Sequence, residues 1–266
     1  MKKLINSAAR GGGHLLALCQ CFEDLFKPVV PGKAARFGFT LAEVLVTLGI
    51  IGVVSAMTVP SLMQNHQRKT YVTQLHKVYN EIQQALMQYQ TDKNAVNLTE
   101  AGLTSIAAVK SFLQTYFRVI ETCDGVTSPC FSTTYKNMNG DNVAQSVTWG
   151  AASCVVISSG ASFCIDRPDY ATISYGGYTT TYGNVFIDVN GAKGPNILGR
   201  DAYYLAIFPD GVLDVNQATP VCRKQGICNG GSIKDVRGSI DNCKTATSNS
   251  YDCFGKILND NWEMTY

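Results

Sequence analysis

The stretch Arg36–Pro60, RFGFTLAEVLVTLGIIGVVSAMTVP, decides how this chain is built. A single carboxylate, Glu43, stands at the head of a run of twenty residues, 44–63, that contains no ionisable side chain. As a helix this run would be about 30 Å long, which matches the hydrocarbon core of a bilayer. An ionised carboxylate at bilayer depth costs roughly 2.5–3.5 kcal/mol on insertion scales. The sequence therefore predicts a membrane-spanning helix, and it requires a partner for Glu43.

The net charge of +2 is unevenly distributed. Residues 1–38 hold six basic and two acidic residues, which leaves 16 basic and 18 acidic residues, a net charge of −2, in the rest of the chain. That part has no Lys/Arg cluster of the kind that binds nucleic acid, so no nucleic-acid partner is expected. Lys33 and Arg36 before the apolar run favour a cytoplasmic N-terminus, although Arg68 and Lys69 on the other side weaken this argument.

The next segment, 64–92, continues the helix with an apolar stripe. Its apolar and aromatic residues recur at steps of three and four, as on one face of a helix: Tyr71, Leu75, Val78, Ile82, Leu86 and Tyr89. No Gly or Pro interrupts residues 61–92. A single helix of about 80 Å from Phe39 to Asp92 is expected. Pro60 predicts a kink or local melting within it.

Beyond residue 93 the pattern changes to short runs typical of strands. These are expected at 153–157, 161–165, 178–182, 184–189, 203–208 and 212–215. Between the first two, a three-residue loop ending at Gly160 puts Cys154 opposite Cys164, within reach of a disulfide. The predicted fold class is α+β: a long N-terminal helix, membrane-spanning and then amphipathic, packed on a disulfide-stapled antiparallel β-rich domain.

Eight of the ten cysteines lie beyond residue 122: Cys123, Cys130, Cys154, Cys164, Cys222, Cys228, Cys243 and Cys253. An even number in one region indicates disulfides and an oxidising compartment. Zinc is the alternative, but its ligands usually come as pairs two to four residues apart. Here six, nine, five and nine residues separate successive partners. We expect sequential pairing, 123–130, 154–164, 222–228 and 243–253, although only the second pair has a geometric argument. These bonds would hold the tail 216–253, which is poor in apolar residues.

One stretch offers ligands for a metal. Asp188 and Asn190 lie on a glycine-rich loop with Asp201 downstream, and hard oxygen ligands of this kind suit calcium. Simple turn chemistry of Asp and Asn side chains is the alternative. No other cofactor is expected. The sequence contains no nucleotide-binding, serine-hydrolase or zinc-protease motif and only three histidines, so no enzymatic activity is expected.

The stretch Gly38-Phe39-Thr40-Leu41-Ala42-Glu43 and the apolar run after it resemble the processing site of type IV prepilins and type II secretion pseudopilins. The resemblance implies that a prepilin peptidase cuts between Gly38 and Phe39 on the cytoplasmic side and methylates the new amine of Phe39. Glu43 and Pro60 match a glutamate and a proline of that family. The 38-residue leader is longer than most leaders of the family. An ordinary signal peptide is the alternative, but its cleavage site would follow the apolar run.

The resemblance implies four segments: a leader, 1–38, that is removed; a transmembrane and filament-core helix, 39–63; its amphipathic continuation, 64–92; and a secreted β-rich domain, 93–266. It also implies a structural subunit of a type IV pilus or secretion pseudopilus. Such a subunit would enter the inner membrane as a single-pass protein with its N-terminus in the cytoplasm. It would then join a periplasmic or extracellular filament.

The expected partners are other pilins in a homo- or hetero-oligomeric filament, the prepilin peptidase, an inner-membrane assembly platform and membrane lipid. Within the filament, the ammonium of Phe39 would pair with Glu43 of a neighbouring subunit, because each charge alone is costly in an apolar interior. One alternative is a minor or tip subunit that acts as an adhesin or DNA-uptake factor, with Tyr175, Tyr178 and Tyr182 as an exposed aromatic patch. The other is a membrane-anchored secreted hydrolase.

Overall fold

A helix of 52 residues, α2, runs from Leu41 to Asp92 and ends at the residue expected from the sequence. The computed structural model describes residues 38–123, 128–143, 152–238, 240–247 and 250–266, so the leader up to residue 37 lies outside the described residues. The chain divides into two compact units between Met57 and Thr58.

The first half of α2 is exposed on every side. All residues from 38 to 67 are exposed, and the apolar ones include Leu45, Ile50 and Met57. The helix is long and apolar enough to cross a membrane, judged by its length and composition. An apolar surface of this extent is not stable in water, so lipid or other helices must cover it.

The second half of α2 buries one face in the core of the second unit. The buried residues are Val72, Leu75, Val78, Ile82, Ala85, Leu86 and Tyr89. This confirms the predicted stripe, except that Tyr71 is only partly buried. Two side chains also anchor the helix: the hydroxyl of Tyr79 donates to the Leu213 carbonyl at 3.3 Å, and Gln83 donates to the Gly211 carbonyl at 3.1 Å.

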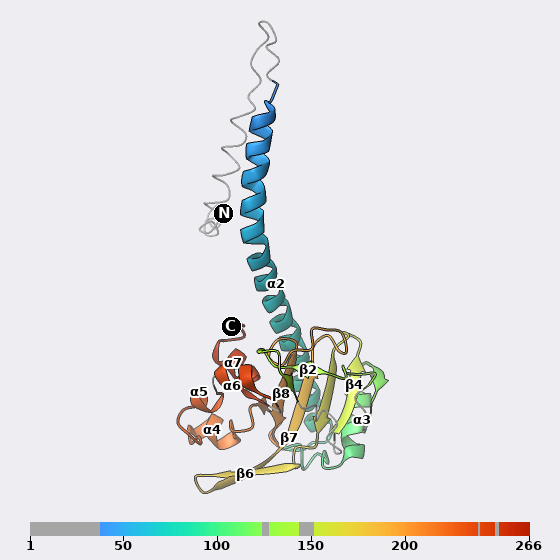
Figure 1. Cartoon of the computed structure of the whole chain (residues 1–266). Helices are drawn as coiled ribbons and strands as arrows, with labels where there is room; N and C mark the ends of the chain where they lie inside the picture. The colour runs from blue at the N-terminus through green and yellow to red at the C-terminus, as the bar shows by residue number, and fades with distance from the viewer. Residues whose placement is uncertain (1–37, 124–127, 144–151, 239, 248–249) are drawn as a thin grey trace, which may run out of the picture. The chain divides into compact units, whose positions relative to one another are not determined.

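An antiparallel sheet of seven strands forms the rest of the core (Figure 1). Its path is β1-β4-β5-β7-β8-β9, and β6 pairs with β7 beside that path. The strands are β1 (Val119–Thr122), β4 (Ala152–Ile157), β5 (Ser162–Asp166), β6 (Ala171–Tyr175), β7 (Tyr178–Asp188), β8 (Ala202–Ile207) and β9 (Leu213–Asp214). A separate pair joins β2 (Tyr135–Lys136) to β3 (Asn142–Val143). The predicted α+β class is therefore confirmed.

The hairpin of β4 and β5 has the predicted register. Cys154 lies opposite Cys164 and forms a disulfide with it. The Ile157 N–H donates to the Ala161 carbonyl at 3.0 Å, and Gly160 has a φ of +86°, a conformation that favours glycine in the turn. The local loop chemistry is therefore sufficient to set this register.

The runs 178–182 and 184–189, expected as two strands, form the single strand β7. Its first part pairs with β6 and its second part with β5 and β8. Gly183 joins the two parts, and a Cβ there would lie 2.3 Å from the Arg167 carbonyl oxygen. The glycine permits this close approach of the backbone instead of breaking the strand.

Helices interrupt the region that the sequence predicts to be β-rich with a disulfide-held tail. They are α3 (Ile106–Tyr116), α4 (Pro220–Gln225), α5 (Ile233–Val236), α6 (Ile240–Thr245) and α7 (Asp252–Asn259). Figure 1 shows α3 beside β4, and α4 to α7 gathered at the other side of the sheet. Ser105 caps α3 by accepting a hydrogen bond from the Ala108 N–H at 3.1 Å, a start signal that strand periodicity overlooks.

Four disulfides are present among the described residues, and they join Cys123 to Cys130, Cys154 to Cys164, Cys222 to Cys228, and Cys243 to Cys253. These are the neighbouring pairs proposed from the sequence. The last one links α6 to α7, so the tail combines short helices with cross-links.

The closing segment of the chain packs against α2. The His76 ring stacks on Trp262 with ring centroids 4.0 Å apart, and Tyr79 meets the same indole edge-on. His76 is therefore partly buried within the unit.

The core face of α2 can be tested with two adjacent residues. Leu86 is fully buried, whereas Met87 is 68% exposed. We expect Leu86→Ala to lower the free energy of unfolding by about 2–5 kcal/mol, because it leaves a cavity in the core. Met87→Ala should change it by less than about 0.5 kcal/mol. Urea unfolding followed by circular dichroism measures both, and equal effects would contradict this packing.

Candidate processing and assembly site

The predicted cleavage site lies just before α2. Gly38 and Phe39 are not helical, and the Phe39 side chain is 83% exposed. No heavy atom outside the neighbouring residues lies within 4 Å of the position that a Cβ of Gly38 would occupy. In the chain that the structure describes, the peptide bond between these two residues is therefore open to an enzyme.

Glu43 has a partner in its own chain. Its Oε2 accepts hydrogen bonds from the N–H and the hydroxyl of Thr40, both at 2.8 Å. The Glu43 N–H donates back to the Thr40 hydroxyl at 3.3 Å. This is a capping box, in which a Thr and a Glu three residues apart satisfy each other's backbone groups at the start of a helix. The stretch Thr40-Leu-Ala-Glu43 is the signal for it, and the sequence analysis overlooked that signal.

The cap satisfies hydrogen bonds but does not neutralise charge. Thr40 is neutral, so Glu43 keeps its carboxylate charge at the head of an apolar helix. Both of its side-chain hydrogen bonds fall on a single oxygen, Oε2. A carboxylate offers about four lone-pair sites, so the cap leaves room for a cationic partner. The pairing of Glu43 with the Phe39 amine of another subunit remains a prediction.

The hydrogen bonding of Thr47 within the apolar helix meets the requirement of a membrane span. The Thr47 hydroxyl donates to the carbonyls of Glu43 and Val44, at 2.9 and 3.0 Å, so this polar side chain is satisfied within the helix. Helical backbone continues through Pro60, so the local melting expected there is not observed. The boundary between the two compact units falls just before this proline.

The three residues suggested for calcium come close together but fit calcium poorly. Each carboxylate oxygen already accepts a hydrogen bond from a protein donor. For Asp188 the donors are the Tyr135 hydroxyl and the Asn190 N–H; for Asp201 they are the Asn196 and Ile197 N–H groups, at 2.8 and 2.7 Å. Among the described residues, no group of three or more His, Cys, Asp and Glu side chains could hold a metal ion.

Burial is the main cause of the raised pKa values of Asp188 and Asp201. It raises the pKa of the Asp188 carboxyl to about 8; the hydrogen bond from Tyr135 lowers this pKa, and the nearby Asp201 raises it. Burial also raises the pKa of Asp201, against the hydrogen bonds from its backbone donors. Bound calcium would instead favour the ionised form of both groups. The arrangement is that of a buried turn in which burial favours the neutral form of both acids.

The candidate aromatic patch is only partly present. Tyr175 and Tyr178 are 41% and 45% exposed at the turn between β6 and β7. Tyr182 is partly buried, with its ring 6.2 Å from that of Phe208 between centroids. Two of the three tyrosines are thus free to meet a partner.

The raised pKa of Asp188 makes a testable prediction. In the unfolded chain this carboxyl has a pKa of about 3.9, so between about pH 4 and pH 8 the folded chain holds the proton more tightly. The stabilisation is complete below about pH 4 and is lost as the pH rises to about 8. We expect the free energy of unfolding in urea to fall over this range, on the order of 1–3 kcal/mol. Asp188→Asn should flatten the fall.

The control for this measurement is Asp241→Asn, because the Asp241 side chain is 86% exposed. It should leave the pH profile unchanged. Calcium should not raise the melting temperature of either the wild type or the variants. A rise with calcium that Asp188→Asn abolishes would instead establish the metal site.

Comparisons with known proteins agree on the N-terminal segment. Residues 33–59 match the family model of the prokaryotic N-terminal methylation motif. The chain is 32% identical over 74 residues to the type II secretion system core protein G of Aeromonas hydrophila, which is 28% of this chain and 51% of that protein. It is 33% identical over 69 residues to the same protein of Pectobacterium carotovorum subsp. carotovorum, covering 26% of this chain and 44% of that protein.

The chain thus spans about half the length of the curated relatives it matches. No solved structure matches it. The motif covers Gly38, Phe39, Glu43 and most of the apolar run. The chain thus carries a prokaryotic N-terminal methylation motif, and over about a quarter of its length it is similar to type II secretion system core protein G.

Proposed function

We propose that this chain is a structural subunit of a secretion pseudopilus or type IV pilus, cut after Gly38 and polymerised through α2. One observation carries the proposal: an N-terminal methylation motif includes the start of an apolar helix that is exposed on all sides. In the membrane, lipid covers that helix. In a filament, the helices of other subunits take the place of lipid.

Packing alone gives such helices little specificity. Lipid tails are as apolar as Leu and Ile side chains, so helices that leave lipid for one another gain mainly van der Waals contact. A polar pair is therefore needed to fix the axial step between subunits. The ammonium formed at Phe39 by cleavage and the carboxylate of Glu43 in the next subunit provide it, since a wrong register would leave both charges unpaired in an apolar core.

The capping box fixes the side-chain position of Glu43 before assembly. In the single subunit, Thr40 holds the carboxylate at the first turn of the helix. The amine of a neighbour then meets a carboxylate whose rotamer is already fixed. Fixing it beforehand reduces the entropy lost on pairing.

The second unit agrees with a location outside the cytoplasm. Its four disulfides are typical of proteins in oxidising compartments. We infer an inner-membrane precursor with a cytoplasmic N-terminus and a globular unit in the periplasm. A prepilin peptidase, an assembly platform and other pilins would then act on it in turn. We propose no catalytic role for this unit.

A tip subunit with an adhesive surface is the second candidate. The exposed Tyr175 and Tyr178 at the β6–β7 turn support it, because exposed aromatic rings are common anchors of protein interfaces. A Tyr175→Ser, Tyr178→Ser double variant should then form filaments normally but lose attachment to the target surface. Normal attachment would exclude this role for the turn.

Processing is tested by the intact mass and N-terminal sequence of the mature protein. The product should begin at Phe39 with one methyl group on its amine, because Gly38 ends the leader. A chain that keeps residues 1–38, or one cut beyond the apolar helix, would contradict the proposal.

The charge of Glu43 is tested by Glu43→Gln. Glutamine can keep the capping box, because its side-chain oxygen can also accept from Thr40. The variant should be inserted and cut normally, yet give at least about tenfold less sedimentable filament, because the Phe39 amine then stays unpaired. Glu81→Gln, on the part of α2 that belongs to the second unit, is the control. Normal filaments from Glu43→Gln would mean that Glu43 serves only as a helix cap.

A further inference from the structure

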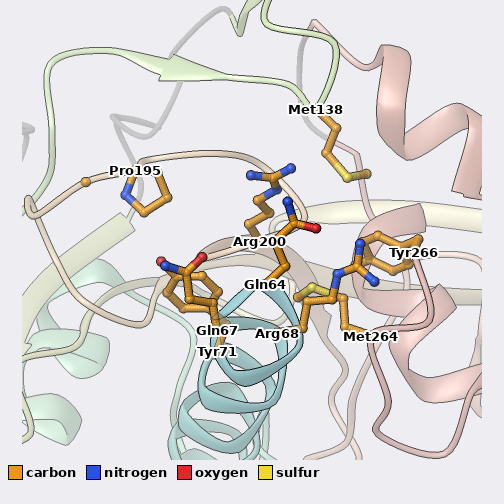
Figure 2. Close-up of a pocket in the computed structure, with 10 residues that line it drawn as sticks. Gln64, Gln67, Arg68, Tyr71, Met138, Pro195, Arg200, Met264 and Tyr266 are labelled. Carbon is orange, nitrogen blue, oxygen red and sulfur yellow. The ribbon is translucent and has the colours of Figure 1, made fainter. Parts of the chain in front are cut away.

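A pocket of about 520 Å³ opens within the second unit beside the start of its part of α2 (Figure 2). Gln64, Gln67, Arg68 and Tyr71 line it from the helix. Arg200, from the loop before β8, and Tyr266, from the closing segment, line it from the other side. Polar and cationic groups therefore dominate its wall.

Within the described residues, the two arginines of this pocket have no carboxylate partner. Among the described residues, neither Arg68 nor Arg200 forms an ion pair or a side-chain hydrogen bond. By contrast, Arg223 binds both oxygens of Asp210, at 2.9 and 2.8 Å, and Arg237 binds Asp214 in the same manner. Guanidinium groups form such bidentate pairs with carboxylates and phosphates alike. Two open guanidiniums in one pocket indicate an anionic ligand.

Nearby acids do not take the role of that ligand. Asp201 follows Arg200 in the chain, but both of its oxygens accept hydrogen bonds from backbone N–H groups. Glu263 does not line this pocket; it lines a neighbouring hollow together with Arg68 and Lys69, and in the described chain it forms no ion pair with Arg68. The Tyr266 hydroxyl donates to the Gly199 carbonyl at 2.9 Å and so fixes the loop that carries Arg200. The cationic side of the pocket is held in place without being neutralised.

The position of the pocket along α2 indicates that the anion comes from the headgroup layer of a bilayer. Met63 is the last residue of the uncharged run, and Gln64 follows it directly. Arg68 lies about 7.5 Å beyond Met63 along the helix axis. The headgroup layer of a bilayer is about 5–8 Å thick beyond each side of the hydrocarbon core. Tyr71 and Tyr266 line the same pocket, and aromatic side chains of this kind are common at membrane interfaces.

We propose that this pocket binds the phosphodiester of an anionic phospholipid, with Arg68 and Arg200 on its oxygens. The Gln64 and Gln67 amides and the Tyr71 hydroxyl are then the neutral donors. The inference rests on the proposed function, because it requires α2 to sit in a bilayer. A subunit held in this way gives up its lipid when it leaves the membrane for a filament.

The test uses the full chain in phosphatidylcholine nanodiscs that contain phosphatidylglycerol, with retained lipids counted by native mass spectrometry. The wild type should retain one phosphatidylglycerol. Arg68→Gln and Arg200→Gln should each reduce retention at least about fivefold, because each removes one guanidinium from the phosphate. Lys69→Gln is the matched control: it removes a charge at the same depth, but Lys69 does not line the pocket. It should leave retention unchanged.

Three results would overturn the lipid site. Equal retention by the arginine variants would exclude the pocket, and equal loss in Lys69→Gln would reduce the effect to general surface charge. Displacement of the lipid by inorganic phosphate would make free phosphate the ligand. Membrane insertion and removal of the leader are measured in the same samples. Failure of the wild type in those two steps overturns the proposed function, whereas normal insertion without arginine-dependent retention overturns only the pocket.

Discussion

The exposed apolar half of α2 is the constraint on which the rest of this structure depends. From residue 44 to residue 63 the helix carries no ionisable side chain, and none of these residues is buried in the described chain. Lipid or other helices must therefore cover it. The second unit, in turn, has a core of its own, formed by one buried face of α2 and a seven-stranded sheet and cross-linked by four disulfides. One helix thus serves two environments, and the change occurs near Arg68, where exposure on all sides ends.

Glu43 connects this constraint to assembly. A carboxylate at the head of an apolar helix is costly unless its charge is matched. Thr40 satisfies its hydrogen bonds within the subunit but leaves the charge unmatched. Cleavage before Phe39 would create the missing cation at the same end of the helix. Processing would therefore do more than remove a leader, because it would supply the group that makes burial of Glu43 in a filament tolerable.

Much of the fold could be predicted from the sequence, because local patterns specify it. The heptad-like spacing of Leu75, Val78 and Ile82 determined the buried face, and the loop ending at Gly160 determined the register of Cys154 and Cys164. The helices after residue 93 were not predicted. A search for strand-like alternation of residues missed the helix cap at Ser105, and the spacing of the cysteines does not indicate the short helices of the tail. The pocket of Arg68 and Arg200 could not be predicted, since it joins segments more than a hundred residues apart.

The distance between the Phe39 amine of one subunit and the Glu43 carboxylate of another tests the proposed pairing of charges most directly. Filaments are assembled from a mixture of subunits labelled with ¹⁵N and subunits labelled with ¹³C, so that solid-state NMR detects only contacts between different chains. The pairing of charges predicts a contact between the Phe39 amine nitrogen and the Glu43 carboxylate carbon, at about 4 Å or less between N and O. Absence of this contact in mixed filaments, with the same contact present in uniformly labelled filaments, would place the pair within one subunit and contradict the account.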